Sequence, residues 1–557
     1  MSRFDHSKYP SQPRVKMSSR RWPDNVIERA PQWCSVDLRD GNQALVEPMT
    51  AAQKLRLWKL LLSIGFKQIE IGFPAASSHD FDFTRKLIEE NLIPADVTVQ
   101  VLTQAREELV AKTFEALKGV PRAIVHVYNS TSTVQREKVF RLDRDGIRDI
   151  AISGAKMLVR EAAKYPETQW TFQYSPESFT GTELDFAVDV CNAVIDVWQP
   201  TPQKKAIINL PATVEMTTPN VYADQVEWMC DRLDRRDSIE ISLHAHNDRG
   251  CAVAASELGV LAGADRVEGT LFGNGERTGN MDIVTMAMNL YSQGIDPGLD
   301  FERMDEIITI ARECTQLPVH PRHPYAGDLV FTAFSGSHQD AIRKCLNDRD
   351  QSAPWEIAYL PIDPADIGRS YEAVIRINSQ SGKGGVTWVL EQDGGYQLPR
   401  WLQIDFSRAV QEFAEQTARE VRPDEVRRLF DETYLQTADT WCVGDYSLSR
   451  KGALDELQAE VSIDGISHAI SGQGNGVVAA FVEALEKHVG LRLVVTEYSE
   501  HALTHSSDAD AVCYVQLNIN GERCCGVGQS SDIVKASMSA IVSAVALSQR
   551  RNATRAA

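Results

Sequence analysis

The sequence lacks the features that mark several classes of protein. No run approaches about 18 consecutive apolar residues, so we expect no membrane span. The N-terminal segment is polar and contains no apolar core of a secretory signal. Positive charge is in deficit, because the formal net charge is -19, and a nucleic-acid partner is therefore not expected. No GxGxxG motif follows the first predicted strand, which argues against a dinucleotide-binding fold.

Cysteine is present, but not in the spacing of a metal or redox motif. There are ten cysteines and no CxxC, and the only tight pair, Cys524 and Cys525, are neighbours that rarely bond to each other. In a chain of 557 residues this pattern is typical of reduced thiols in a cytoplasmic protein. The length itself predicts more than one domain.

After an N-terminal arm at residues 1–29, a strand–helix alternation repeats through residues 30–300. Alternation of this kind predicts parallel strands joined by helical crossovers. Eight units favour an α/β fold of the closed (β/α)₈, or TIM-barrel, type, with an open doubly wound sheet as the alternative. The eight predicted strands are residues 33–38, 68–72, 97–102, 123–128, 170–174, 206–210, 239–244 and 266–271.

The rest of the chain divides into two further parts. Residues 301–435 break the alternation with turn-rich segments and helical pieces, and we interpret them as connecting, mostly helical subdomains. Residues 436–557 contain an internal repeat in which a strand, a turn at Asp464-Gly465 or Asn520-Gly521, a second strand and a helix follow one another. Two strand–strand–helix units predict an α/β regulatory domain that senses a small molecule, although duplication for stability alone would leave the same pattern.

Polar residues at the predicted C-terminal ends of the barrel strands carry the chemical signal, because active sites of TIM barrels lie there. His244 and His246 share one strand face, and Asp40 follows the first strand. Together they predict a site of two histidines and one carboxylate for a metal ion. An isolated HxH pair is more often a hydrogen-bonded surface feature.

Other polar groups gather at the same predicted rim. Asn280 ends a glycine-rich loop, residues 273–280, which alone would predict only an anion-binding turn before a helix. Glu177 is a candidate catalytic group, although a rim glutamate often only forms a salt bridge. The remaining candidates at these strand ends are Ser175, Thr213, His126 and Tyr128.

Three motifs, LRDGNQ from Leu38, HAHND from His244 and GNGERTGN from Gly273, resemble the metal-dependent aldolase-like barrel superfamily. The resemblance continues through FSGSHQDAI from Phe334, through YLPIDPADIGRSYEAVIRINSQSGKGG from Tyr359, and through the C-terminal repeat. This longer pattern is similar to the alpha-isopropylmalate synthase family in its long form. The related hydroxymethylglutaryl-CoA lyases use a cysteine in the loop after the last strand, and residues 273–280 contain none.

The resemblance implies roles for individual residues. It makes Asp40, His244, His246 and Asn280 the metal shell, most often for Mg²⁺, with Mn²⁺ or Zn²⁺ as alternatives. It implies that Arg39 stabilises an oxyanion and that Ser175 and Thr213 contact the oxo acid, with His126 and Tyr128 as further substrate contacts. The implied catalytic groups are Arg39, Glu177, His338 and Tyr371. His338 and Tyr371 lie in the connecting part, so we expect the partner subunit of a homodimer to supply them; Tyr359 is the alternative to Tyr371.

The reaction implied is a Claisen-type condensation of acetyl-CoA with 3-methyl-2-oxobutanoate, followed by thioester hydrolysis to 2-isopropylmalate and CoA. This is the first committed step of leucine biosynthesis, and leucine is the expected inhibitor. The candidate leucine contacts are Gly472, Gly474, Gly476, Gly526 and Gly528. The alternatives are a homocitrate or citramalate synthase, or a non-catalytic amino-acid-binding regulator.

Overall fold

A computed structural model describes residues 4–9, 14–371, 383–417, 421, 423–436, 441–503 and 510–556. The chain forms two compact units: one is Met1–Phe331 with Ile362–Ser370, and the other is Thr332–Pro361 with Tyr371–Ala557. The predicted boundaries at residues 29, 300 and 435 remain predictions. Within the part of the chain that is described, no helix is both long and apolar enough to cross a bilayer.

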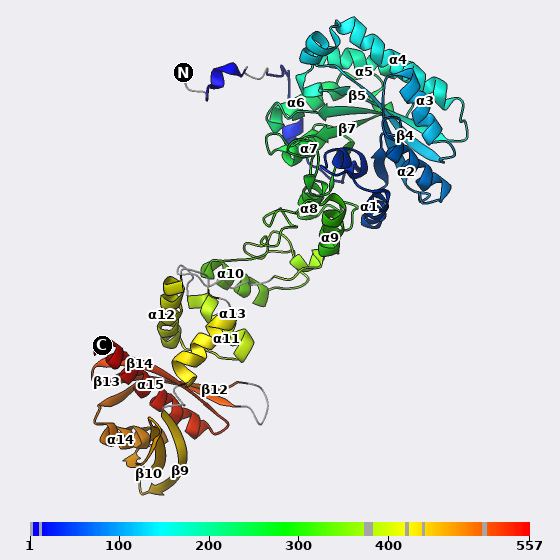
Figure 1. The fold of residues 1–557 in the computed structure, drawn as a ribbon. Coiled ribbons are helices and arrows are strands. Elements are labelled where there is room, and N and C mark those ends of the chain that lie inside the picture. Colours follow the sequence, from blue (N-terminus) through cyan, green and yellow to red (C-terminus); the bar gives the residue numbers. More distant parts are fainter. Residues whose placement is uncertain are drawn as a thin grey trace. The chain divides into compact units, whose positions relative to one another are not determined.

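The first unit is the predicted closed barrel (Figure 1). It has eight parallel strands, and β8 is hydrogen-bonded back to β1. Its strands are β1 (Gln32–Ser35), β2 (Gln68–Gly72), β3 (Thr98–Gln104), β4 (Arg122–Ser130), β5 (Gln169–Glu177), β6 (Ala206–Ala212), β7 (Ile239–Ala245) and β8 (Arg266–Gly269). The helices that follow them are α1 (Ala51–Ile64), α2 (Ser78–Glu89), α3 (Glu107–Ala116), α4 (Arg144–Ala162), α5 (Leu184–Trp198), α6 (Pro219–Cys230), α7 (Ala252–Leu261) and α8 (Ile283–Tyr291). The unit continues with α9 (Met304–Thr315).

Local sequence explains where α1 begins. Thr50 and Gln53 form a reciprocal capping box, in which each side chain bonds the backbone N–H of the other residue. The buried face of the helix carries Leu57, Trp58 and Leu61. Side chains at this helical spacing cover the outside of the barrel.

The first strand is shorter than predicted. It ends at Ser35 instead of residue 38, and Asp37–Gly41 form a single π-helical turn. The carboxylate of Asp37 accepts the backbone N–H of Leu271, 3.0 Å from its Oδ1, and the hydroxyl of Ser35 at its Oδ2. This turn ties the end of β1 to the end of β8, and it directs the residues after Leu38 across the barrel mouth.

The inside of the barrel is polar. Arg266 and Glu268 on β8, Glu70 on β2 and Gln100 on β3 are all at most 1% exposed, and they form a connected hydrogen-bond network. Buried charges are tolerated when they are paired in this way. This network lies beneath the polar residues at the mouth of the barrel.

The second unit begins with helices α10 (Gly336–Asn347), α11 (Lys383–Gly394), α12 (Arg400–Thr417) and α13 (Pro423–Phe430). Apolar side chains of α11, α12 and α13 share a buried cluster with two later strands, including Phe406, Phe430 and Tyr514. Residues 372–382, part of the motif that begins at Tyr359, lie outside the described residues.

The repeat forms two similar halves. The first half is β9 (Trp441–Lys451), β10 (Leu454–Ile463), β11 (Ile466–Gly474) and α14 (Val477–Val489). The second is β12 (Leu493–Ala502), β13 (Ala511–Ile519), β14 (Glu522–Ser530) and α15 (Ile533–Ala556). Each half contains the predicted strand–strand–helix unit and one preceding strand that the sequence analysis did not include, so the sheets have three strands each.

The predicted hairpin turns explain the register of both halves. Asp464, Gly465, Asn520 and Gly521 all have positive φ, as a two-residue type I′ turn requires. The helices that follow the two repeats begin at Val477 and Ile533.

Candidate active site

A cavity of about 240 Å³ opens where the barrel strands end. It is small for a ligand pocket, since pockets for drug-sized molecules usually measure about 300–1,000 Å³. All the residues that line it belong to the first unit. Nine of them were predicted as site residues: Arg39, Asp40, His126, Tyr128, Ser175, Glu177, Thr213, His244 and His246.

Three of these residues converge as a metal-binding group would. Oδ2 of Asp40 lies 3.3 Å from Nε2 of His244 and 3.4 Å from Nε2 of His246. The three ligand atoms lie within 4.8 Å of one another, and all three residues are buried. Two imidazoles and one carboxylate around an open space form a donor set that divalent cations bind.

The other ring nitrogens of the two histidines are already occupied. Nδ1 of His244 lies 2.8 Å from Oε2 of Glu268, and Nδ1 of His246 lies 2.7 Å from the carbonyl oxygen of Thr213. An Nδ1–H that donates to these acceptors leaves Nε2 with a lone pair. Both lone pairs then point to the space beside Asp40.

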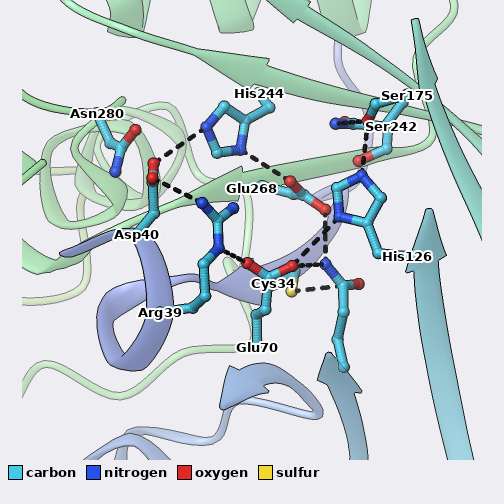
Figure 2. A network of polar contacts seen from close by, with 12 residues as sticks. Cys34, Arg39, Asp40, Glu70, His126, Ser175, Ser242, His244, Glu268 and Asn280 are labelled. Atoms are coloured by element: carbon cyan, nitrogen blue, oxygen red, sulfur yellow. Dashed lines mark hydrogen bonds and ion pairs between the residues drawn. The ribbon is translucent and has the colours of Figure 1, made fainter. Parts of the chain in front are cut away.

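The side chain of Asn280 indicates whether the site suits a cation. It pairs with His246 in an isolated β-bridge, and Figure 2 shows its side chain on the Asp40 side of the site. Its Nδ2 donates to the carbonyl oxygen of Asn274 at 3.2 Å, whereas its buried Oδ1 has no hydrogen-bond partner among the described residues. A buried amide oxygen without a donor is costly unless something else binds it, and a cation would do so. The residues present therefore fit a divalent metal ion.

Arg39 organises the other side of the aspartate. Its Nη1 donates to Oδ1 of Asp40 at 2.7 Å, and its Nε donates to the fully buried carboxylate of Glu70. Burial alone would raise the pKa of Asp40, but Arg39 and the two histidines outweigh it and hold this pKa well below its usual value. Asp40 is therefore a carboxylate throughout the physiological range.

The far wall of the cavity carries hydroxyl, amide and imidazole groups. Nε2 of His126 lies 2.7 Å from Oγ of Ser175, which also accepts from Nδ2 of Asn209 at 2.9 Å. Glu177 accepts a hydrogen bond from Ser130, and burial raises the pKa of the Tyr128 hydroxyl. These polar groups can orient a small polar substrate opposite Asp40.

Known proteins resemble this chain over nearly its whole length. The 2-isopropylmalate synthase of Pseudomonas savastanoi pv. phaseolicola is 54% identical over 551 residues, 99% of this chain and 98% of that protein. The 2-isopropylmalate synthase of Rhodospirillum rubrum is 55% identical over 544 residues, 96% of this chain and 98% of that protein. The chain belongs to the 2-isopropylmalate synthase family.

Family models match three consecutive parts of the chain. Residues 30–310 match the HMGL-like family, residues 328–391 the post-catalytic domain of alpha-isopropylmalate synthase, and residues 420–548 the LeuA allosteric (dimerisation) domain. Membership of the 2-isopropylmalate synthase family thus covers both the barrel and a regulatory domain. Among solved structures, an HMG-CoA lyase from Acenitobacter baumannii in complex with coenzyme A and 3-methylmalate aligns with a TM-score of 0.42. That alignment has 16% identity and covers 53% of this chain and 94% of the lyase.

Two predicted catalytic residues of this family member lie in the second unit. His338 is near the start of α10, and its exposed ring stacks on Tyr359 with 4.0 Å between centroids. The half-buried Tyr371 lies at the edge of the described residues, and burial raises the pKa of its hydroxyl. Their roles in the reaction remain predictions.

The sequence analysis missed the residues beneath the site. The residues that were not predicted are Glu70, Gln100, Arg266 and Glu268. Each of them contacts a residue at the mouth of the barrel, or contacts a residue that does so. A signal was present: their strands alternate polar and apolar residues, whereas buried parallel strands are usually apolar throughout. Alternation of polar and apolar residues along the strands of a parallel barrel therefore indicates a polar interior.

Four of the five glycines predicted as leucine contacts have another explanation. A Cβ at Gly472 or Gly474 would lie 2.4 Å from backbone atoms of α14, and one at Gly526 or Gly528 would lie 2.1 Å from backbone atoms of α15. The absence of a side chain lets each helix lie directly on its sheet. The geometry explains why these four positions are glycines by helix packing, and their role as ligand contacts remains a prediction.

Gly476 differs from the other four. It has a φ of 137°, no atom lies within 4 Å of its Cβ position, and it lines an open cavity of about 670 Å³ in the second unit. Apolar side chains of α14, β12 and α15 line the rest, together with three acids: Glu483, Glu486 and Glu500. The backbone N–H groups that begin α14 have no side-chain cap. This cavity therefore combines an apolar wall, acidic groups and the N-terminal end of a helix.

Proposed function

We propose that this chain condenses acetyl-CoA with 3-methyl-2-oxobutanoate and hydrolyses the thioester to give 2-isopropylmalate and free CoA. The observation that carries the proposal is the convergence of two imidazole Nε2 atoms and Arg39 on one carboxylate, Asp40, at the mouth of the barrel. Family membership supports the same reaction, because its relatives are named for it.

Asp40, His244, His246 and Asn280 would hold the divalent cation. Mg²⁺ is our first choice, because a carboxylate and an amide oxygen suit it, while the two imidazoles also allow Mn²⁺ or Zn²⁺. A cation bound there supplies Lewis-acid polarisation of the keto group.

The other lining residues bind and orient the oxo acid. Arg39 stabilises the oxygen on which charge develops, and Ser175 and Thr213 contact the acid beside His126 and Tyr128. The two arginines of the cavity, Arg39 and Arg277, are each paired with a carboxylate. A second carboxylate, as in 2-oxoglutarate, would therefore find neither arginine unpaired, which favours the monocarboxylate with an aliphatic tail.

A base must take a proton from the methyl group of acetyl-CoA. We assign this step to His338, with Glu177 as its supporter or as the base itself, and Tyr371 as a further acid–base group. The carbanion then forms a bond to the keto carbon, and the keto oxygen takes the electron pair and then a proton. Water breaks the C–S bond and releases CoA as a thiol. The match to a dimerisation domain supports a homodimer, and we propose that the partner subunit supplies His338.

For the second unit we propose leucine as the inhibitor, bound in the cavity at Gly476. An α-amino acid has a carboxylate for the N-terminus of α14, an ammonium for the acids and an aliphatic side chain for the apolar wall. All ten cysteines are free, which supports a reducing, cytoplasmic location.

The test measures release of free thiol from acetyl-CoA with 3-methyl-2-oxobutanoate, 2-oxoglutarate or pyruvate, each with and without EDTA and leucine. We expect 3-methyl-2-oxobutanoate to be preferred, EDTA to abolish release and leucine to reduce it. Preference for another oxo acid would change the substrate and leave the chemistry in place. No thiol release from metal-loaded protein with any oxo acid would overturn the proposal.

A further inference from the structure

Glu268 lies at the bottom of the site and contacts one of the two histidines from below. Its Oε2 lies 2.8 Å from Nδ1 of His244 (Figure 2). Its Oε1 accepts from Arg266 at 2.6 Å and from Gln173 at 2.7 Å. Nε2 of Gln100 also reaches Oε1, at 3.1 Å. The two carboxylate oxygens of Glu268 therefore have different partners. Oε1 accepts from three side chains, and Oε2 faces only the imidazole of His244.

We propose that Glu268 is a positioning residue that fixes the tautomer and ring orientation of His244, so that Nε2 of His244 is ready as a metal ligand. A carboxylate can only accept, so Nδ1 of His244 must carry the hydrogen. In the neutral imidazole that can bind a cation, the lone pair then lies on Nε2, which faces Oδ2 of Asp40. An acceptor behind a ligating histidine is a common means of orienting a metal site.

The three donors around Oε1 make this assignment testable with a nearly isosteric change. In Glu268→Gln, the amide oxygen must stay with Arg266, because a guanidinium has donors and no acceptor. The amide NH₂ then faces Nδ1 of His244 and forces that nitrogen to accept. The hydrogen moves to Nε2, on the side where the cation binds.

We expect Glu268→Gln to weaken Mn²⁺ binding by about 10- to 100-fold, as is usual for loss of a partner behind a metal-bound histidine. The measurement is calorimetric titration of Mn²⁺ into the full-length chain after removal of metal with a chelator. The Mn²⁺ concentration that half-activates thiol release should shift by the same factor, whereas kcat at saturating Mn²⁺ should fall less.

Glu70→Gln is the matched control. Glu70 is as buried as Glu268, belongs to the same network through Gln100, and carries the same charge, but it does not contact His244. Weaker Mn²⁺ binding in Glu268→Gln than in Glu70→Gln supports the positioning role. Equal weakening in the two variants would overturn it, because the effect would then be loss of negative charge in general. Wild-type affinity in Glu268→Gln would overturn it too.

Glu268→Asp covers the case in which the glutamine variant does not fold. It keeps the charge and the acceptor but shortens the side chain by one methylene, so the contact with His244 lengthens. We expect a Mn²⁺ affinity between those of the wild type and Glu268→Gln, or simply below wild type if only this variant folds; unchanged affinity would count against the role. The inference rests on the metal site of the proposed function, yet its readout is Mn²⁺ binding. It can therefore fail while the condensation is confirmed, and the reverse is also true.

Discussion

Arg39 and Asp40 are neighbours in the chain, and Nη1 of Arg39 donates a 2.7 Å hydrogen bond to Oδ1 of Asp40. The other oxygen of Asp40 faces the two histidines. The π-helical turn after β1 makes this possible, because it directs both side chains to the mouth of the barrel. One carboxylate thus joins the proposed oxyanion donor to the proposed metal shell.

Arg39→Lys should separate the effect of the proposed oxyanion donor on the rate from its effect on the proposed metal site. A lysine cannot contact Glu70 and Asp40 with the planar fork of an arginine. We expect kcat to fall by about 10²- to 10³-fold, as for loss of one oxyanion donor, with a much smaller change in Mn²⁺ affinity. Steady-state kinetics and calorimetry on the same preparation measure both. A loss of Mn²⁺ binding as large as the loss of rate would mean that Arg39 acts mainly through Asp40.

Metal binding should depend on pH through His244. Burial lowers the pKa of His244, but hydrogen bonds to Asp40 and Glu268 outweigh burial and raise this pKa from 6.5 to about 9 in the metal-free protein. Protonated His244 therefore stabilises the metal-free fold below about pH 6.5, and this contribution is lost as the pH rises through about 9.

Because a cation must displace the proton on Nε2, Mn²⁺ affinity should rise by up to about tenfold per pH unit between about pH 7 and pH 8.5. Calorimetry in two buffers of different ionisation enthalpy should show release of about one proton per Mn²⁺. An affinity that does not change over this range, with no proton released, would contradict the assignment.

His338→Ala should lower kcat by about 10²- to 10⁴-fold, the usual contribution of a general base, without loss of Mn²⁺ affinity. The exposed His320 is the control, because the same substitution there should leave kcat unchanged. If Glu177→Gln lowers kcat more than His338→Ala does, then Glu177 is the base. Loss of metal together with activity in His338→Ala would show that its proposed role is wrong.

Gly526→Ala should destabilise the second unit. The added Cβ would lie 2.1 Å from the carbonyl oxygen of Ala540, so α15 must move away from its sheet. Forced repacking of this kind costs about 1–3 kcal/mol. Urea unfolding of the full chain measures the loss, and Gly444→Ala is the control, since its nearest atom would be 3.2 Å away. Equal stability of the two variants would contradict the packing explanation.

Val478→Trp should fill the cavity at the start of α14 and abolish inhibition by leucine, with kcat in the absence of leucine retained. The thiol-release assay with a leucine titration measures both. Ile466→Trp is the matched control, because Ile466 is 64% exposed and does not line the cavity. Leucine inhibition that persists in Val478→Trp would place leucine elsewhere.

The sequence predicted the barrel because its helices are amphipathic and its strands recur at regular intervals. It predicted Asp40, His244 and His246 as one group, since strand ends meet at one rim of a barrel. The end of the first strand was predicted three residues late, because nothing local marks Asp37 as the start of a π-helical turn.

Other features needed coordinates. The bonds of Glu268 join strands that are distant in the chain, and no local pattern says which histidine it contacts. The glycines of β11 and β14 carry two signals at once, since close helix packing and ligand approach both require a missing side chain. Only the position of α14 and α15 shows that close helix packing requires these glycines.

Pairing of β1 with β8 sets the order in which the site can be assembled. Asp40 follows the first strand, and Asn280 follows the last, so the proposed ligands come together only after the two ends of the barrel have met. A nascent chain cannot hold a cation there until residue 280 has been synthesised and β8 has docked. A cation that binds the closed barrel and not the open chain then favours closure by mass action. Binding of a cation at the proposed site would therefore require a closed barrel.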